Sequence, residues 1–328
     1  MRFLVLAAAL LAAAPTAAQA DKACQAAIAF STARSGAAVL ALRDGKPVCE
    51  GYAASGAADH AMEIWSGAKS FSGAMLAAAV QDKLITPDEP VSKTLPEWAA
   101  DPRKAKVTIR HLLSLTSGMR STVGQVPTYA QAVAMPLSAD PGELFAYGPG
   151  PYQVFGEVMR RKLVAAGQPA DPYLYLKRRI LDPIGLKGEW RHMPNGDALL
   201  PQGAILTVRE WVKFGEFVRA GGVWNGKALV DRATFADLFR GSTANGGYGV
   251  TFWLAKASTS NDSVTATNDL TKAAGLPDDL VMAAGAGNQR LYIIPSRKLV
   301  VARLAEFDGR PRPGPKWSDT EFIRFFLD

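Results

Sequence analysis

The chain has 328 residues, of which 48% are hydrophobic, 20% charged and 9% aromatic, with a formal net charge of +7. This composition is typical of an ordered globular protein and excludes disordered, collagen-like and coiled-coil proteins. A chain of this length buries enough surface to fold without a metal or a disulfide framework. Lys and Arg residues form no run of the nucleic-acid-binding kind, so we expect no nucleic-acid partner.

The N-terminus has the pattern of a secretory signal. Arg2 precedes an apolar run of twelve residues, 3–14, and Ala18-Gln19-Ala20 follows as a small-x-small cleavage pattern. A stable membrane-spanning helix needs about 20 apolar residues, and no later stretch is long enough to span a membrane. We therefore predict that residues 1–20 are cleaved and that the mature protein, starting near Asp21, is periplasmic or secreted. The alternative is a buried N-terminal helix.

The chain contains two cysteines, Cys24 and Cys49. In an oxidising compartment, two cysteines at this separation most simply form one disulfide. Two buried free thiols are the alternative.

The hydrophobic pattern suggests strands at both chain ends and helices between them. In chain order it predicts a hairpin over 37–53, a buried helix over 66–84, helices over 152–166 and 207–220, strands over 248–255, 282–294 and 298–306, a polar loop over 255–280, and a last helix over 318–327. The fold class is therefore α/β or α+β: an antiparallel sheet built from both chain ends, flanked by helices, with a helical subdomain at roughly 85–240 inserted in a domain spanning 21–328.

Ser66 and Lys69 form the pattern most suggestive of chemistry. Residues three apart share one helix face, and burial of a lysine favours its neutral form, which can take a proton from a serine hydroxyl. The N-terminus of the helix also offers N–H groups to an oxyanion. These features suit acyl transfer, although a helix-capping Ser66 with a solvated Lys69 is the alternative for so short a motif.

Other motifs are weaker. The chain has no Gly-x-Ser-x-Gly, His-Glu-x-x-His or Walker sequence, and residues 285–290 lack the third glycine of a dinucleotide-binding loop. His60, His111 and His192 have no metal-ligand spacing, so we expect no metal site. We interpret His111 as a packed helix residue, whereas His192, in a polar loop, is a possible substrate contact.

Further segments resemble one family. In order they are residues 66–71, 88–91, 95–98, 107–118, 141–147, 182–186, 207–222 and 247–249. Over about residues 30–310 the chain resembles the serine β-lactamase-related family, which includes class C β-lactamases, D-alanyl-D-alanine carboxypeptidases, esterases and amide hydrolases.

The resemblance implies a role for each matching residue. Ser66 would be the acylated nucleophile, Lys69 its proton acceptor and Tyr147 a proton relay, without a metal or organic cofactor. The N–H groups of Ser66 and Ala286 would form the oxyanion hole. We expect a phenol to relay protons only if nearby ammonium groups lower its pKa. A packed loop aromatic is the alternative for Tyr147.

Two departures from the family pattern bear on the substrate. The Tyr-x-Asn box ends in Pro149, and the Lys/His-x-Gly box falls at Ala283-Ala284-Gly285, which has no cation. In the family that cation meets a substrate carboxylate, so its loss favours esters or amides without one. Gly285 would still border the substrate, and Arg290 is a possible substitute for the cation.

These patterns support three hypotheses. The first is an exported serine hydrolase acting on a small-molecule or peptide-like acyl substrate. The second is a β-lactamase or D-alanyl-D-alanine carboxypeptidase that uses Arg290 as the cation. The third is a non-catalytic binding protein of the cell envelope. The polar segment 255–280 is either a wall of the substrate site or a plain surface loop.

Overall fold

The computed structural model describes residues 17–310 and 314–327. Its main feature is a six-stranded antiparallel sheet of order β2-β1-β11-β10-β9-β8. The strands are β1 (Gly36–Arg43), β2 (Lys46–Tyr52), β8 (Trp253–Leu254), β9 (Val281–Gly285), β10 (Gln289–Ile294) and β11 (Leu299–Ala305). Two of them come from the N-terminal part of the chain and four from the C-terminal part, which confirms the predicted fold class.

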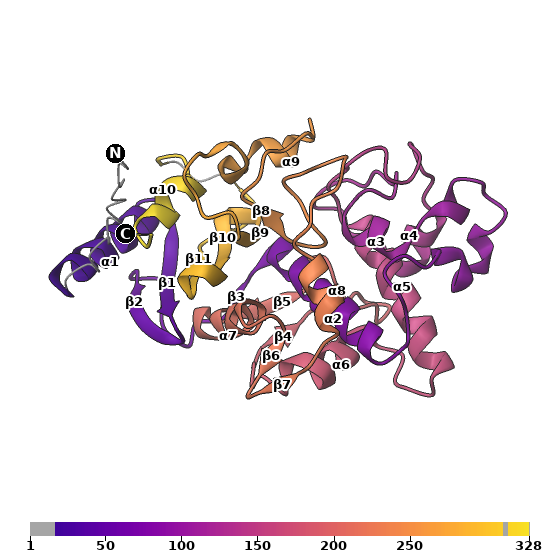
Figure 1. Ribbon diagram of the computed structural model, residues 1–328, viewed down its shortest axis with the longest axis horizontal. Helices are drawn as coiled ribbons and strands as arrows, with labels where there is room; N and C mark the ends of the chain where they lie inside the picture. The colour runs from indigo at the N-terminus through magenta and orange to yellow at the C-terminus, as the bar shows by residue number, and fades with distance from the viewer. Residues whose placement is uncertain (1–16, 311–313, 328) are drawn as a thin grey trace, which may run out of the picture.

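Helices cover both faces of the sheet (Figure 1). On one face, α7 (Val208–Arg219) packs so closely that a Cβ on Gly215 would lie 2.4 Å from the Val300 side chain. On the other face lie α1 (Ala17–Thr32) and α10 (Asp319–Arg324), which contact each other through Phe30 and Phe322. Side chains of β10 pack alternately against the helices on the two faces, because neighbouring residues of a strand point to opposite faces of the sheet.

The middle of the chain forms the helical region seen on the right of Figure 1. The remaining helices are α2 (Lys69–Gln81), α3 (Ile109–Leu113), α4 (Tyr129–Ala134), α5 (Gly150–Ala165), α6 (Pro172–Leu176), α8 (Arg232–Asp237) and α9 (Ser263–Ala266). Two small sheets comprise β3 (Met62–Glu63), β5 (Ala204–Leu206) and β4 (Glu189–Trp190), and β6 (Val223–Trp224) and β7 (Lys227–Ala228). Helix α2 is buried between the large sheet and this region, as its small apolar residues predict.

The disulfide prediction is confirmed. Cys24 on α1 is bonded to Cys49 on β2, with their Cα atoms 5.2 Å apart. Of the predicted leader, residues 1–16 lie outside the described part of the chain, and Ala17–Ala20 form the first turn of α1. Within the described ranges no helix has the length and apolar character needed to cross a membrane.

One predicted strand is mostly wrong. Of residues 248–255, only Trp253 and Leu254 form a strand, β8. The cause is Thr251, whose φ of 74° is left-handed and turns the chain back so that Tyr248 bridges Trp253. A β-branched residue rarely adopts this conformation, so its β propensity gives no sign of the turn.

Candidate active site

Ser66 lies on a tight turn that precedes a buried helix. The 3₁₀ turn η1 (Trp65–Ala68) leads directly into α2, and Ser66 itself is partly exposed. Trp65 enters this turn with a left-handed φ of 50°. Such a conformation costs about 1 kcal/mol or more in a residue other than glycine, and strain of this kind is concentrated at functional sites.

Lys69 is buried beside the Ser66 hydroxyl. Its Nζ donates to Ser66 Oγ at 3.0 Å and to the Pro201 carbonyl oxygen at 3.2 Å, and only 3% of the residue is exposed. No carboxylate within the described ranges forms an ion pair with it. Because burial penalises the ammonium form, the pKa of Lys69 falls to about 7. A large share of Lys69 is therefore neutral at pH 7 and able to accept a proton.

Tyr147 also lies beside Ser66. Its phenol interacts with the Ser66 hydroxyl, and its ring centre is 4.9 Å from Lys69 Nζ. Burial raises the pKa of Tyr147 to about 12, although the Ser66 interaction and the charge of Arg290 oppose the rise. The phenol therefore stays protonated at neutral pH, contrary to the expectation that ammonium groups lower its pKa.

The end of β9 touches η1, the turn that carries Ser66. A Cβ on Gly285 would lie 2.0 Å from the Ile64 carbonyl oxygen and 3.2 Å from the Gly67 nitrogen, so only glycine fits there. The contact places Ala286, the next residue, beside the turn that carries Ser66. Two backbone segments that each offer an N–H group thus meet where the family resemblance predicts an oxyanion hole.

Arg290 does not face this site. Residues paired across a sheet share a face, and Arg290 pairs with Ala284 and Arg303, on the side of α1 and α10. Its guanidinium is buried and bonded to Asp319 at 2.6 Å. Arg290 therefore lacks the exposure needed to meet a substrate carboxylate, and the prediction that it substitutes for the missing cation is wrong.

The segment Tyr147-Gly148-Pro149, which replaces the family's Tyr-x-Asn box, differs from that pattern for a local reason. A Cβ on Gly148 would lie 2.2 Å from Ser121 Oγ, and Pro149 begins helix α5 as its N-cap. Tyr147 itself is held by stacking on Trp253, with ring centres 5.6 Å apart. The box thus positions the tyrosine but offers no amide to a substrate.

Sequence patterns gave no sign of two polar contacts. One is the Pro201 carbonyl that accepts from Lys69. The other is Asp262, whose Oδ2 accepts from the Tyr147 N–H at 3.1 Å while its Oδ1 caps α9. Both come from loops far away in sequence. Asp262 belongs to the predicted loop 255–280, so this segment reaches the backbone of the candidate site.

His111 and His192 both form hydrogen bonds within the protein. His111 caps helix α3 through reciprocal bonds with Thr108, as a packed helix residue would. His192 has both ring nitrogens occupied, by the Asp171 carboxylate at 3.0 Å and the Trp190 carbonyl oxygen at 3.1 Å.

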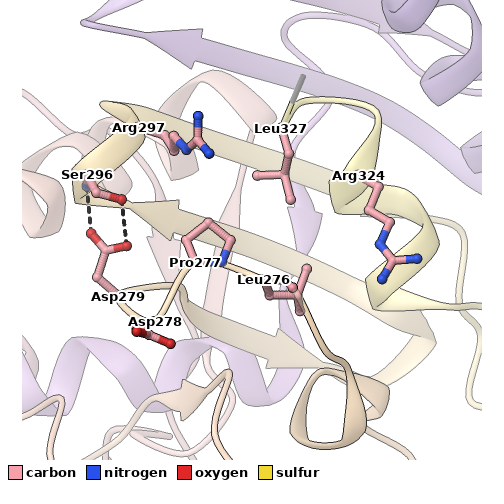
Figure 2. A pocket seen from close by; sticks show the side chains of 9 residues that line it. Leu276, Pro277, Asp278, Asp279, Ser296, Arg297, Arg324 and Leu327 are labelled. Atoms are coloured by element: carbon pink, nitrogen blue, oxygen red, sulfur yellow. Dashed lines mark hydrogen bonds between the residues drawn. The ribbon is translucent and has the colours of Figure 1, made fainter. Parts of the chain in front are cut away.

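A separate cavity of about 820 Å³ lies between the segment before β9, the β10–β11 turn and α10 (Figure 2). Asp279 at its rim accepts from the N–H and the hydroxyl of Ser296, at 2.6 and 2.8 Å. None of Ser66, Lys69 and Tyr147 lines it, so it is distinct from the candidate active site.

The chain is similar to known proteins in sequence pattern and in fold. A family model described as beta-lactamase matches residues 15–322. A candidate beta-lactamase from Bacteroides dorei is similar in structure, with 16% identity, 94% of this chain and 97% of the other covered, and a TM-score of 0.71. A comparison with curated proteins gave no match.

Two further solved structures are similar at the level of fold. The hydrolase EstCE1, described as having promiscuous acyltransferase activity, shares 16% identity, with 88% of this chain and 94% of the other covered and a TM-score of 0.65. A penicillin-binding protein homologue from Caulobacter crescentus shares 15% identity, with 88% and 91% covered and a TM-score of 0.66. Because the family model spans most of its length, the chain belongs to the beta-lactamase family.

Proposed function

We propose that this protein is an exported serine hydrolase that cleaves a neutral ester or amide through an acyl-enzyme on Ser66. The observation that carries the proposal is Lys69, a buried amine without a carboxylate partner in the described ranges, 3.0 Å from the Ser66 hydroxyl. Members of the family are serine hydrolases. The Cys24–Cys49 disulfide supports export, because such bonds persist in oxidising compartments.

The reaction begins with proton transfer. Neutral Lys69 accepts the Ser66 proton as Oγ attacks the substrate carbonyl carbon. The resulting oxyanion accepts hydrogen bonds from the N–H groups of Ser66 and Ala286. Protonated Tyr147 donates to the leaving group, and the Lys69 ammonium returns a proton to the phenolate. The leaving group departs as a neutral alcohol or amine, and water then releases the acid by the same steps in reverse.

The substrate is inferred from the charges around Ser66. Ala283 and Ala284 offer no cation where the family has its Lys/His-x-Gly box, and the buried Arg290 forms an ion pair with Asp319. A substrate carboxylate would therefore lose water without gaining an ion pair. Esters and amides that lack a carboxylate next to the scissile bond fit this site better than β-lactams or D-alanyl peptides.

Intact-protein mass spectrometry after exposure to a fluorophosphonate tests the nucleophile. We expect one covalent adduct on the wild-type protein and none on Ser66→Ala. Ser70→Ala is the matched control and should keep the adduct, because the Ser70 hydroxyl is buried and donates to the Thr251 carbonyl.

The outcomes separate the alternatives. An adduct that persists in Ser66→Ala would show that another group is the nucleophile. Absence of any adduct on the wild-type protein would leave a binding protein as the better description. A parallel adduct with benzylpenicillin, lost in Ser66→Ala, would favour β-lactam or D-alanyl-peptide chemistry over neutral esters.

A further inference from the structure

The turn that carries the proposed oxyanion donor Ala286 is held from behind by a buried arginine. We propose that Arg290 is a positioning residue that orients the peptide between Gly285 and Ala286 and so aims the Ala286 N–H at the substrate oxyanion. This inference rests on the proposed acyl-enzyme function of Ser66.

The first step is the planarity of the peptide. The Gly285 carbonyl and the Ala286 N–H belong to one rigid unit and point in opposite directions. Arg290 Nη1 donates to the Gly285 carbonyl oxygen at 3.0 Å, and fixing the carbonyl also fixes the N–H. A cationic donor on the carbonyl further polarises the peptide, which strengthens its N–H as a donor.

The second step is the rigidity of the guanidinium itself. A guanidinium has five N–H donors, and here they make five hydrogen bonds, including the one to Gly285. The others run to the Gln289 carbonyl at 3.0 Å, to Asn288 Oδ1 at 3.3 Å, and to the two oxygens of Asp319 at 2.6 and 3.4 Å. All five donors are used, so a change of side-chain conformation would break several hydrogen bonds at once.

Asp319 anchors this arrangement from helix α10. Its carboxylate is 1% exposed and also accepts from the Tyr292 hydroxyl at 2.5 Å and the Trp317 indole N–H at 2.8 Å. Because both groups are buried, separating Asp319 from Arg290 would leave two buried charges unpaired. The last helix of the chain is thereby coupled to the turn at Ala286.

Arg303 offers a matched comparison. It is fully buried next to Arg290, and it donates to the Asn288 and Gly287 carbonyl oxygens at 2.6 and 3.4 Å. It makes no hydrogen bond to Gly285. Arg303 therefore stabilises the far half of the same turn and leaves the Gly285–Ala286 peptide untouched.

The test compares Arg290→Lys with Arg303→Lys, using hydrolysis of 4-nitrophenyl acetate, binding of phenylboronic acid and thermal unfolding. Removing an oxyanion donor outright costs about 10²–10³ in kcat. A misaligned donor should cost less, so we expect Arg290→Lys to lower kcat roughly 10- to 100-fold. KM should change little, because the donor acts on the transition state. The boronate adduct should weaken by the same factor as kcat/KM.

For Arg303→Lys we expect a lower melting temperature with kcat close to the wild-type value. Unchanged kcat in a folded Arg290→Lys protein, or an equal loss of kcat in Arg303→Lys, would overturn the inference. If Arg290→Lys does not fold, Asp319→Asn replaces it: it leaves Arg290 in place but loosens it, and unchanged kcat there would also overturn the inference. Absence of a fluorophosphonate adduct on the wild-type protein would instead contradict the proposed function.

Discussion

Burial separates the candidate catalytic side chains into two kinds. Ser66 is partly exposed and can be reached by a substrate, whereas Lys69 and Tyr147 are 3% and 8% exposed. Loss of water lowers the pKa of the amine and raises that of the phenol, because it disfavours the charged form of each. The same low-polarity surroundings thus yield a neutral base and a neutral acid near neutral pH.

These two pKa values predict the pH dependence of the reaction. Lys69 accepts a proton only when neutral, so kcat/KM should fall about tenfold per pH unit below pH 7. It should level off above pH 7 and stay high until the Tyr147 phenol ionises near pH 12. Hydrolysis of 4-nitrophenyl acetate from pH 5 to 9 checks the lower limb. Lys69→Met should lose activity at every pH, and a rate independent of pH between 6 and 8 would refute the role of Lys69.

At the scale of elements, the site depends on the contact between β9 and η1. Gly285 allows the strand to meet the Ile64 carbonyl without an intervening side chain. The main chains of the two segments therefore set their separation, while the Arg290 side chain donates to the Gly285 carbonyl oxygen next to this contact. Addition of one methyl group at Gly285 should therefore displace β9 from η1.

We predict that Gly285→Ala lowers kcat/KM at least about 100-fold, because the added Cβ forces β9 and its oxyanion donor away from Ser66. Gly56→Ala is the control: its Cβ would lie 2.0 Å from the Ala37 carbonyl oxygen, so the clash is the same but remote from the site. Circular dichroism and steady-state kinetics on both variants separate misfolding from misalignment. Equal activity losses per folded molecule would contradict the prediction.

Local patterns predicted much of the fold. The hairpin over 37–53 and the helices over 152–166 and 207–220 appear as β1–β2, α5 and α7 within a few residues. In each the signal lies within the element: a turn tripeptide, or apolar residues at helical spacing.

What escaped prediction depends on contacts between distant segments. Alternation in β10 shows that Arg290 and Leu291 point to opposite faces but not which face meets Ser66, so the sequence leaves Arg290 as a possible substitute for the missing cation. Pro201 acts through its carbonyl, which every residue has, and Asp262 lies in a polar loop with many similar residues. Their roles follow only from the folded chain.

At the scale of the molecule, segments from both chain ends form one sheet, and the candidate catalytic groups lie where this sheet meets the helical region. The Cys24–Cys49 bond joins α1 to β2, at the sheet edge away from β9. Three strands separate β2 from β9, so about 19 Å of sheet lies between the strand that carries Cys49 and the strand that ends at Gly285. Its contribution should be to stability alone.

We expect the double variant Cys24→Ser, Cys49→Ser to lower stability by about 3 kcal/mol, because the unfolded chain regains the freedom of the opened loop. The melting temperature should fall by roughly 5 °C. At 25 °C, kcat for 4-nitrophenyl acetate should stay within about twofold of the wild-type value. Thermal melts with and without a reducing agent provide the measurement. A loss of activity at a temperature where the variant remains folded would show that the disulfide also shapes the site.

The meeting of main chains at Gly285 and Ile64 also bears on how a hydrolase of the proposed kind can diversify. The proposed nucleophile and oxyanion donor are positioned by this backbone contact and by the Arg290–Gly285 hydrogen bond, so side-chain replacements elsewhere should leave that arrangement intact. The segment 255–280 reaches Tyr147 through the Asp262 side chain, and besides buried residues such as Leu270 it has exposed positions that can vary. New substrate ranges should therefore arise first by mutation in this segment, and libraries directed there should yield altered selectivity while the reaction centre is inherited unchanged.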